Sequence, residues 1–185
     1  MRVWLLLMAQ ALLLAQTGTQ NGEWRFYGGD DRGTKYSPLD QINASNVRQL
    51  QVAWRFAGAN FGPRPDTAWQ VTPLMVRDTL YFTAGTRRTV VAADAATGET
   101  KWTYRFDEDP ARGVVRQNNR GLGYWTDGRE ERLIVITPGY QLIAVDAKTG
   151  RGIPGFGTKG AVDLFVGLDR EKVEPGTIGA TSPVM

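Results

Sequence analysis

The chain has 185 residues, 42% of them hydrophobic, and a net charge of +3 from 22 basic and 19 acidic side chains. The basic residues are dispersed among acidic ones, which argues against a nucleic-acid-binding stripe. The sequence contains no cysteine and no histidine, and this excludes disulfides, thiolate chemistry, the usual zinc ligand sets and histidine-based catalytic triads. Twenty-two glycines, nine prolines and 10% aromatic residues favour an all-β protein of short strands and tight turns.

The N-terminus begins with "MRVWLLLMAQALLLA", in which one cation precedes an apolar run, and small polar residues follow. The run is short for a membrane-spanning helix but has the length of a signal-peptide core. Residues 1–17 are therefore predicted to be a secretory signal, cleaved after Ala15 or Thr17. An uncleaved N-terminal anchor is the alternative.

A repeated motif gives the strongest structural signal. "VVAADAATGETKW" (90–102) and "LIAVDAKTG" (142–150) share the pattern A-x-D-A-x-T-G and lie about 50 residues apart. The aspartate can accept hydrogen bonds from the turn that it opens, and Gly98 or Gly150 supplies the positive φ that a tight reversal needs. Each copy thus predicts a strand, a turn and a returning strand.

Alternating apolar runs upstream of each copy predict further strands, at residues 71–76, 79–84, 120–125 and 132–137. Residues 49–56, "QLQVAWRF", match the returning strand at 99–106 through Trp54 and Trp102. Such a tryptophan can pack into the neighbouring repeat. Four short strands in each period of about 50 residues are typical of a β-propeller blade, and fit a solenoid or sandwich less well.

The second repeat departs from the first after Gly150. Residues 151–179 are rich in glycine and proline, lack tryptophan, and are predicted to cross one face of the molecule before the next blade. "ATSPVM" (180–185) then resembles "VTPLM" (71–75), the start of a first strand. Two blades and one outer strand cannot close a propeller, so residues 22–185 are expected to be the N-terminal portion of a longer protein.

Gln70 and Arg120 each stand before the first strand of a predicted blade. Because first strands line the central channel of a propeller, both side chains are expected at one end of that channel. Arginine there can bind a carboxylate or phosphate bidentately, and Thr137, which ends the next strand, offers a hydroxyl. The alternative is that Arg120 pairs with a nearby aspartate or stacks on Trp125. Two acidic pairs are assigned to solvated loops: Asp107-Glu108 and Glu130-Glu131.

Several motifs, in this order, resemble the N-terminal part of the quinoprotein dehydrogenases that use pyrroloquinoline quinone (PQQ), in particular the glucose-dehydrogenase-like branch: "GDDRGTKYSPLDQIN", "NVRQLQVAWRF", "QVTPLMV", "NRGLGYW", "TPGYQLIAVDAKTG" and "GFGTKGAVDL". The resemblance implies an eight-bladed β-propeller in the periplasm, with PQQ and Ca²⁺ at one end of the channel. It assigns Arg120 to one cofactor carboxylate and Thr137 to another. Gln70 falls where several family members have a glutamate that contacts a carboxylate.

The segment ahead of Arg120 departs from the family. The alcohol-oxidising branch has adjacent cysteines there and the glucose branch a histidine, and this sequence has neither. The residue that stacks on the quinone is therefore unassigned, with Asn118 and Asn119 as candidates. The catalytic aspartate and the calcium ligands are expected beyond Met185.

The resemblance implies oxidation of a sugar or alcohol hydroxyl. A carboxylate takes the hydroxyl proton, calcium polarises the quinone, hydride passes to PQQ, and electrons leave to a quinone or cytochrome. Such a protein could associate peripherally with the inner membrane. The alternative function is that of a non-catalytic propeller of the same repeat, acting as a periplasmic scaffold.

Overall fold

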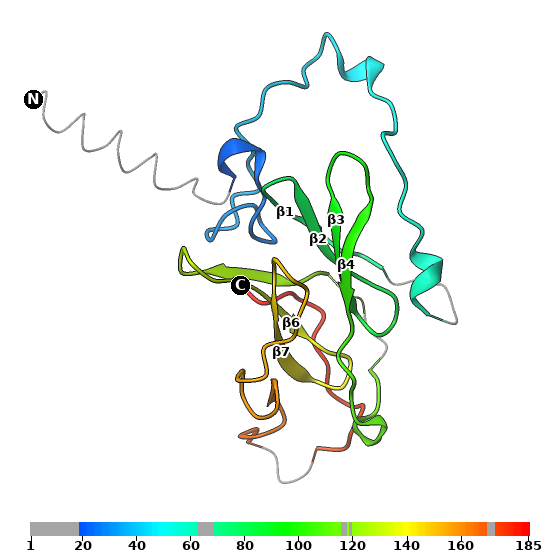
Figure 1. Ribbon diagram of the computed structural model, residues 1–185, viewed down its shortest axis with the longest axis vertical. Coiled ribbons are helices and arrows are strands. Elements are labelled where there is room, and N and C mark those ends of the chain that lie inside the picture. The colour runs from blue at the N-terminus through cyan, green and yellow to red at the C-terminus, as the bar shows by residue number, and fades with distance from the viewer. Residues whose placement is uncertain (1–18, 63–68, 116–117, 119, 170–172) are drawn as a thin grey trace, which may run out of the picture.

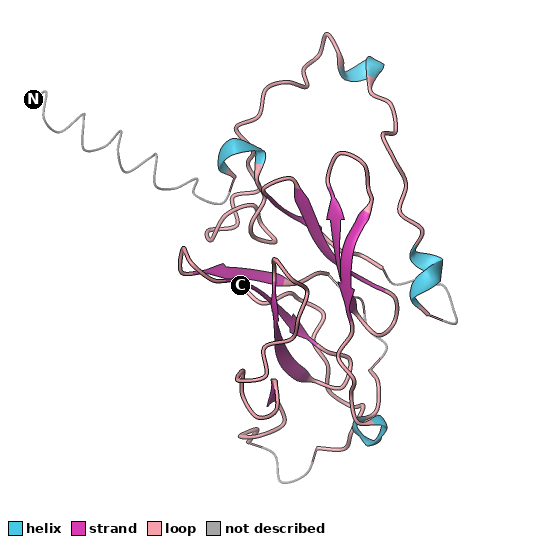
Figure 2. Cartoon of the chain, in the orientation of Figure 1, coloured by secondary structure: helices cyan, strands magenta, loops and turns pink. Residues whose placement is uncertain are grey.

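The fold was analysed in a computed structural model that describes residues 19–62, 69–115, 118, 120–169 and 173–185. The predicted signal peptide, residues 1–17, lies outside this part of the chain. The described helices are four short 3₁₀ segments: η1 Gln20–Gly22, η2 Val47–Gln49, η3 Gly58–Phe61 and η4 Pro110–Arg112. None of them is long and apolar enough to cross a membrane. The remainder is strand, turn and loop (Figure 2).

The strands form two four-stranded antiparallel sheets, in which each strand pairs with its neighbours in sequence (Figure 1). The first blade contains β1 Leu74–Val76, β2 Thr79–Ala84, β3 Thr89–Asp94 and β4 Thr100–Tyr104. The second blade contains β5 Gly123–Thr126, β6 Glu131–Ile136, β7 Gln141–Asp146 and β8 Ala161–Asp163. The two four-stranded units predicted from the repeat are confirmed.

The D-A-x-T-G turns form as their residue types predict. Asp94 Oδ1 accepts hydrogen bonds from the backbone N–H groups of Ala96 and Thr97, both at 3.0 Å. The hydrogen bonds from Thr97 and Ala96 outweigh partial desolvation and lower the pKa of Asp94. Gly98 closes the turn at φ 73° with its N–H on the Asp94 carbonyl at 2.8 Å. The second copy repeats these bonds, so the turn is determined locally.

Each tryptophan of the repeat lies over the turn of the following unit. A Cβ atom built on Gly98 would lie 2.5 Å from Cδ2 of Trp54, and one built on Gly150 would lie 2.5 Å from Cδ2 of Trp102. Trp54 also donates Nε1–H to the carbonyl of Ala95 at 3.0 Å. Glycine is thus required twice over at these turns, for its positive φ and for the close approach of an indole ring. The predicted packing of tryptophan into the neighbouring repeat is confirmed.

Two expected elements differ from the prediction. Residues 49–56 form no strand. Both sheets of the described residues are made of other segments, and neither pairs with this one. Conversely, part of the segment predicted to cross one face returns as β8, with Asp163 opposite Gln141 and Ala161 opposite Ile143. A three-residue strand lies below the length at which alternation can be recognised in a sequence.

The main hydrophobic core lies between the two blades. Successive side chains of a strand point to opposite faces, so alternate residues of each sheet meet here. The buried side chains at this interface include Leu74, Val76, Tyr81, Val90, Leu122, Leu133, Val135 and Val145. The opposite face of the first blade buries Phe82 and Val91 against aromatic residues of the preceding segment, among them Phe56 and Trp69. Burial of both faces is the packing expected of a propeller blade.

Candidate functional site

The inner strands β1 and β5 begin at the same end of the molecule, here called the lead-in end. The residues before each inner strand are joined there through the backbone: Thr72 N–H donates to the Arg120 carbonyl at 3.0 Å, and Arg120 N–H donates to the Thr181 carbonyl at 3.2 Å. Three lead-in segments, residues 70–73, 120–122 and 180–183, therefore lie side by side. Because the strands are antiparallel, the β2–β3 and β6–β7 turns face the same end.

The Arg120 side chain is exposed at this end. Within the described part of the chain its guanidinium makes no ion pair, hydrogen bond or ring contact. The ring of Trp125 is covered instead by Arg132, whose guanidinium carbon lies 5.1 Å from the ring centroid. The alternative pairing of Arg120 with Trp125 is thus wrong, and among the described residues the arginine has no partner for its charge.

Gln70 also lies at the lead-in end and is exposed. Its Oε1 accepts a hydrogen bond from Asn118 Nδ2 at 3.0 Å. Two amides from successive lead-in segments therefore form a pair in which the N–H₂ group of Gln70 has no partner among the described residues and can donate to a ligand. Asn119, the other candidate for stacking on a quinone, lies outside the described residues.

The strand registers refine the correspondence between the two blades. Leu74 and Gly123 are the first ladder residues of β1 and β5. Counting back three residues from each, Arg120 corresponds to Val71, and Gln70 lies one residue further from its strand. The two predicted site residues share an end of the fold but are not equivalent positions.

Thr137 follows β6 directly at the lead-in end but is buried, with 4% of its surface exposed. Its hydroxyl donates to the carboxylate of Glu108, which also accepts the Gly139 N–H at 2.9 Å. The Thr137 oxygen in turn accepts from Gln141 N–H at 3.1 Å. Thr137 therefore already has a carboxylate partner within the chain, and its contact with a cofactor stays a prediction.

The loop that carries Glu108 is fixed at a second point by Arg112. Its guanidinium donates to both carboxylate oxygens of Asp163, at 3.0 and 2.6 Å, and to the Gly139 carbonyl at 3.0 Å. This fork, despite partial desolvation, lowers the pKa of Asp163. Glu108 lies in a loop, as predicted, but its side chain is half-buried rather than solvated, because its partners lie in a turn that is distant in sequence.

Metal ligands do not gather in the described residues, which hold no cluster of three or more aspartate, glutamate, histidine or cysteine side chains. The Ca²⁺ site stays a prediction for residues outside this chain.

The comparisons with known proteins agree with this geometry. Residues 24–185 match the family described as "PQQ: Glucose/ethanol/alcohol dehydrogenase, beta-propeller domain". The chain belongs to the PQQ β-propeller family. The predicted all-β propeller fold is thereby confirmed.

Relatives in the PQQ β-propeller family include dehydrogenases for several substrates. The chain is 34% identical to the glycerol dehydrogenase large subunit of Gluconobacter oxydans over 88% of its own length and 23% of that protein. It is 32% identical to the quinoprotein glucose dehydrogenase of Escherichia coli over 87% of its length and 22% of that protein. It superposes on the quinohemoprotein alcohol dehydrogenase of Comamonas testosteroni with a TM-score of 0.62 and 30% identity, covering 83% of this chain and 21% of that structure. The chain thus spans about a quarter of the length of its relatives.

The donors at the lead-in end can be tested against the cofactor that the family implies. PQQ is a planar tricarboxylate, and it requires cationic and hydrogen-bonding groups at the rim of its site. The guanidinium of Arg120, which has no partner among the described residues, and the amide of Gln70 fit this requirement. The neighbour missed by sequence reasoning is Thr181, which the Arg120–Thr181 backbone hydrogen bond brings to the same place. The available signal was its position: Thr181 lies two residues before Pro183, as Val71 lies two residues before Pro73 in the first blade.

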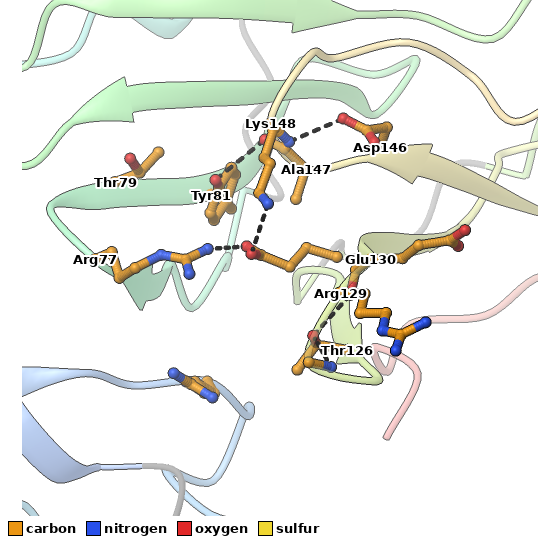
Figure 3. Close-up of polar contacts among 12 residues, drawn as sticks. Arg77, Thr79, Tyr81, Thr126, Arg129, Glu130, Asp146, Ala147 and Lys148 are labelled. Atoms are coloured by element: carbon orange, nitrogen blue, oxygen red, sulfur yellow. Dashed lines mark hydrogen bonds and ion pairs between the residues drawn. The ribbon is translucent and has the colours of Figure 1, made fainter.

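At the opposite end of the blades, a buried carboxylate joins the two sheets. Glu131, 6% exposed, pairs with Arg77 of the first blade and lies 3.5 Å from Lys148 Nζ. Figure 3 shows Arg77 and Lys148 converging beside Tyr81, whose hydroxyl donates to the Ala147 carbonyl at 3.1 Å. Burial raises the pKa of Glu131, but the hydrogen bond and charge of Arg77 outweigh it and the net pKa is lowered. The assignment of Glu131 to a solvated loop was wrong.

Replacement of Arg77 by alanine is expected to destabilise the complete gene product by about 1–2 kcal/mol at pH 7, because Glu131 loses its main partner. Since the folded-state pKa of Glu131 is lowered, its contribution is present above the ordinary value of 4.5 and is lost as pH falls through the folded pKa. The difference between wild type and Arg77→Ala in urea unfolding should therefore shrink below about pH 4. Arg129→Ala, which removes an exposed arginine at the same end, serves as the control. A difference that is constant with pH would contradict this assignment.

Proposed function

We propose that the complete protein is a PQQ-dependent dehydrogenase that oxidises a sugar or alcohol hydroxyl. The observation that carries this proposal is the exposed guanidinium of Arg120, unpaired among the described residues, at the lead-in end of a PQQ-family propeller. An unpaired arginine at a site of this kind has a ready partner in a cofactor carboxylate. The names of the relatives, which include glycerol, glucose and alcohol dehydrogenases, support this class of substrate.

The residues of this chain bind and orient the cofactor. Arg120 holds one carboxylate through its planar fork. Gln70, with Asn118 behind it, donates an amide hydrogen at the rim. The Arg120 backbone is fixed on both sides by its bonds to Thr72 and Thr181, so that the guanidinium projects from a rigid support.

The remaining parts of the reaction are assigned outside this chain. Bound PQQ supplies an ortho-quinone that accepts hydride from the substrate. A carboxylate base and the Ca²⁺ ligands lie in other blades, and a quinone or cytochrome takes the electrons. The apolar segment at residues 1–17 supports a periplasmic location, with peripheral membrane association, and the glucose-dehydrogenase-like branch is the proposed subfamily.

The test is reconstitution of the complete gene product. Purified without cofactor, it should bind PQQ in an equilibrium titration followed by quenching of tryptophan fluorescence. With PQQ and Ca²⁺ added it should reduce a dye in the presence of glucose, glycerol or ethanol. Omission of PQQ should abolish dye reduction. Absence of PQQ binding would favour the scaffold function, and dye reduction without PQQ would overturn the proposal.

A further inference from the structure

Arg88 links segments that are distant in the sequence at the lead-in end. It lies in the β2–β3 turn of the first blade and is partly buried. Its guanidinium donates from Nη1 to the Ile136 carbonyl at 2.7 Å and from Nη2 to the Ala180 carbonyl at 2.6 Å. One side chain of the first blade therefore reaches both the end of β6 and the third lead-in segment.

The backbone at Arg88 is unusual for an arginine. Its φ is 52°, in the left-handed region, where glycine or asparagine is the common choice in a turn. Its N–H closes the turn on the Gly85 carbonyl at 3.0 Å. Such a conformation is strained and persists where the surroundings fix it. The turn bond and the two carbonyl contacts of the guanidinium are interactions that can fix it.

The contacts of Arg88 lead directly to the candidate site. Ala180 precedes Thr181, whose carbonyl accepts the N–H of Arg120. The Arg120 carbonyl in turn accepts the N–H of Thr72. Arg88 therefore sits at one end of a continuous series of hydrogen bonds that fixes the three lead-in segments relative to one another.

We propose that Arg88 is a positioning residue that holds the third lead-in segment in place and thereby orients Arg120 toward the PQQ carboxylate. The inference rests on the proposed function for its ligand. Two separate carbonyls require the two N–H groups of a rigid fork, which lysine cannot supply with a single ammonium. Without the Arg88 guanidinium, water hydrates the Ala180 carbonyl and the hydrogen bond from Arg120 N–H to the Thr181 carbonyl weakens. The Arg120 side chain is then held less precisely toward the cofactor.

The experiment compares Arg88→Ala and Arg88→Lys with Arg87→Ala in the complete gene product. Arg87 is the adjacent residue of the same turn and is exposed, so its replacement removes the same charge. The dissociation constant for PQQ is measured by titration of the cofactor-free protein. Amide hydrogen exchange is followed in the same protein for peptides covering residues 72, 120–122 and 181, and for β7 as an internal reference.

The expected result is that both Arg88 variants bind PQQ roughly tenfold more weakly, the loss expected for charge-assisted hydrogen bonds, while Arg87→Ala stays within about twofold of wild type. Exchange should accelerate at Thr72 and Arg120 but not in β7, which separates positioning from general destabilisation. Unchanged exchange at Arg120, or acceleration that extends equally through β7, would overturn the inference. If wild type binds no PQQ, the proposed function fails, and the exchange data still decide whether Arg88 orders the lead-in segments.

Discussion

Arg120→Ala in the complete gene product should weaken PQQ binding on the order of 100-fold, a loss of about 3 kcal/mol. The guanidinium is free of other partners in the described residues, so its removal takes away a ligand contact and leaves no protein carboxylate unpaired. Stability should change little for the same reason. Arg120→Lys should give an intermediate affinity, because it keeps the charge but loses the bidentate fork.

The matched control for Arg120 is Arg129→Ala. Arg129 is equally an exposed arginine of the second blade, but it lies in the β5–β6 turn at the opposite end. A long-range effect of net charge would lower affinity in both variants, and increasing salt would remove it. Direct contact between Arg120 and PQQ predicts that only Arg120→Ala loses affinity for the cofactor. Equal affinities of Arg120→Ala and wild type would contradict the assignment of Arg120 to the cofactor.

Gly150→Ala should destabilise the protein by about 2–4 kcal/mol, through two separate effects. The backbone at Gly150 has φ 70°, which costs a residue with a side chain about 1 kcal/mol. The added Cβ atom would also lie 2.5 Å from Cδ2 of Trp102, and relief of this clash costs about 1–3 kcal/mol. Trp102 packs against the core between the blades, so its displacement would loosen their contact. The measurement is the midpoint of urea unfolding.

Gly128→Ala separates the two effects. Gly128 has φ 90°, but a Cβ atom there would meet nothing within 4 Å. It should therefore cost only the backbone strain, about 1 kcal/mol. Gly98→Ala should behave like Gly150→Ala, because Trp54 covers Gly98 at the same distance. If Gly150→Ala were no more destabilising than Gly128→Ala, the indole ring could not be packed on the turn as described.

Much of the fold could be predicted because it depends on short-range chemistry. The aspartate, threonine and glycine of each D-A-x-T-G turn bond within a few residues of one another, so the pattern alone predicts the reversal. The alternation of apolar residues predicts the strands, and the repeat predicts that they form blades. The position of Arg120 before an inner strand follows from the same register.

The missed features depend on partners that are distant in sequence. Glu108 was assigned to solvent although its carboxylate meets Thr137 and Gly139, because a loop sequence does not reveal which turn it lies on. Glu131 was assigned to solvent for the same reason, although Arg77 of the first blade covers it. Strand β8 was missed because its partner strand, β7, rather than its own sequence makes it a strand.

The sequence by itself determined the all-β class, the blade repeat, its turns and the location of an arginine at the start of an inner strand, since each follows from local hydrogen bonding and period-two burial. Only the tertiary structure decided which of the polar groups are free. It leaves the guanidinium of Arg120 without a protein partner in the described chain, engages the hydroxyl of Thr137 with Glu108, and brings Arg88 to the carbonyl of Ala180. Whether a polar group can bind a ligand depends on whether another group of the protein already bonds to it. The bonding partners here come from segments distant in sequence, so no short segment of sequence reveals them.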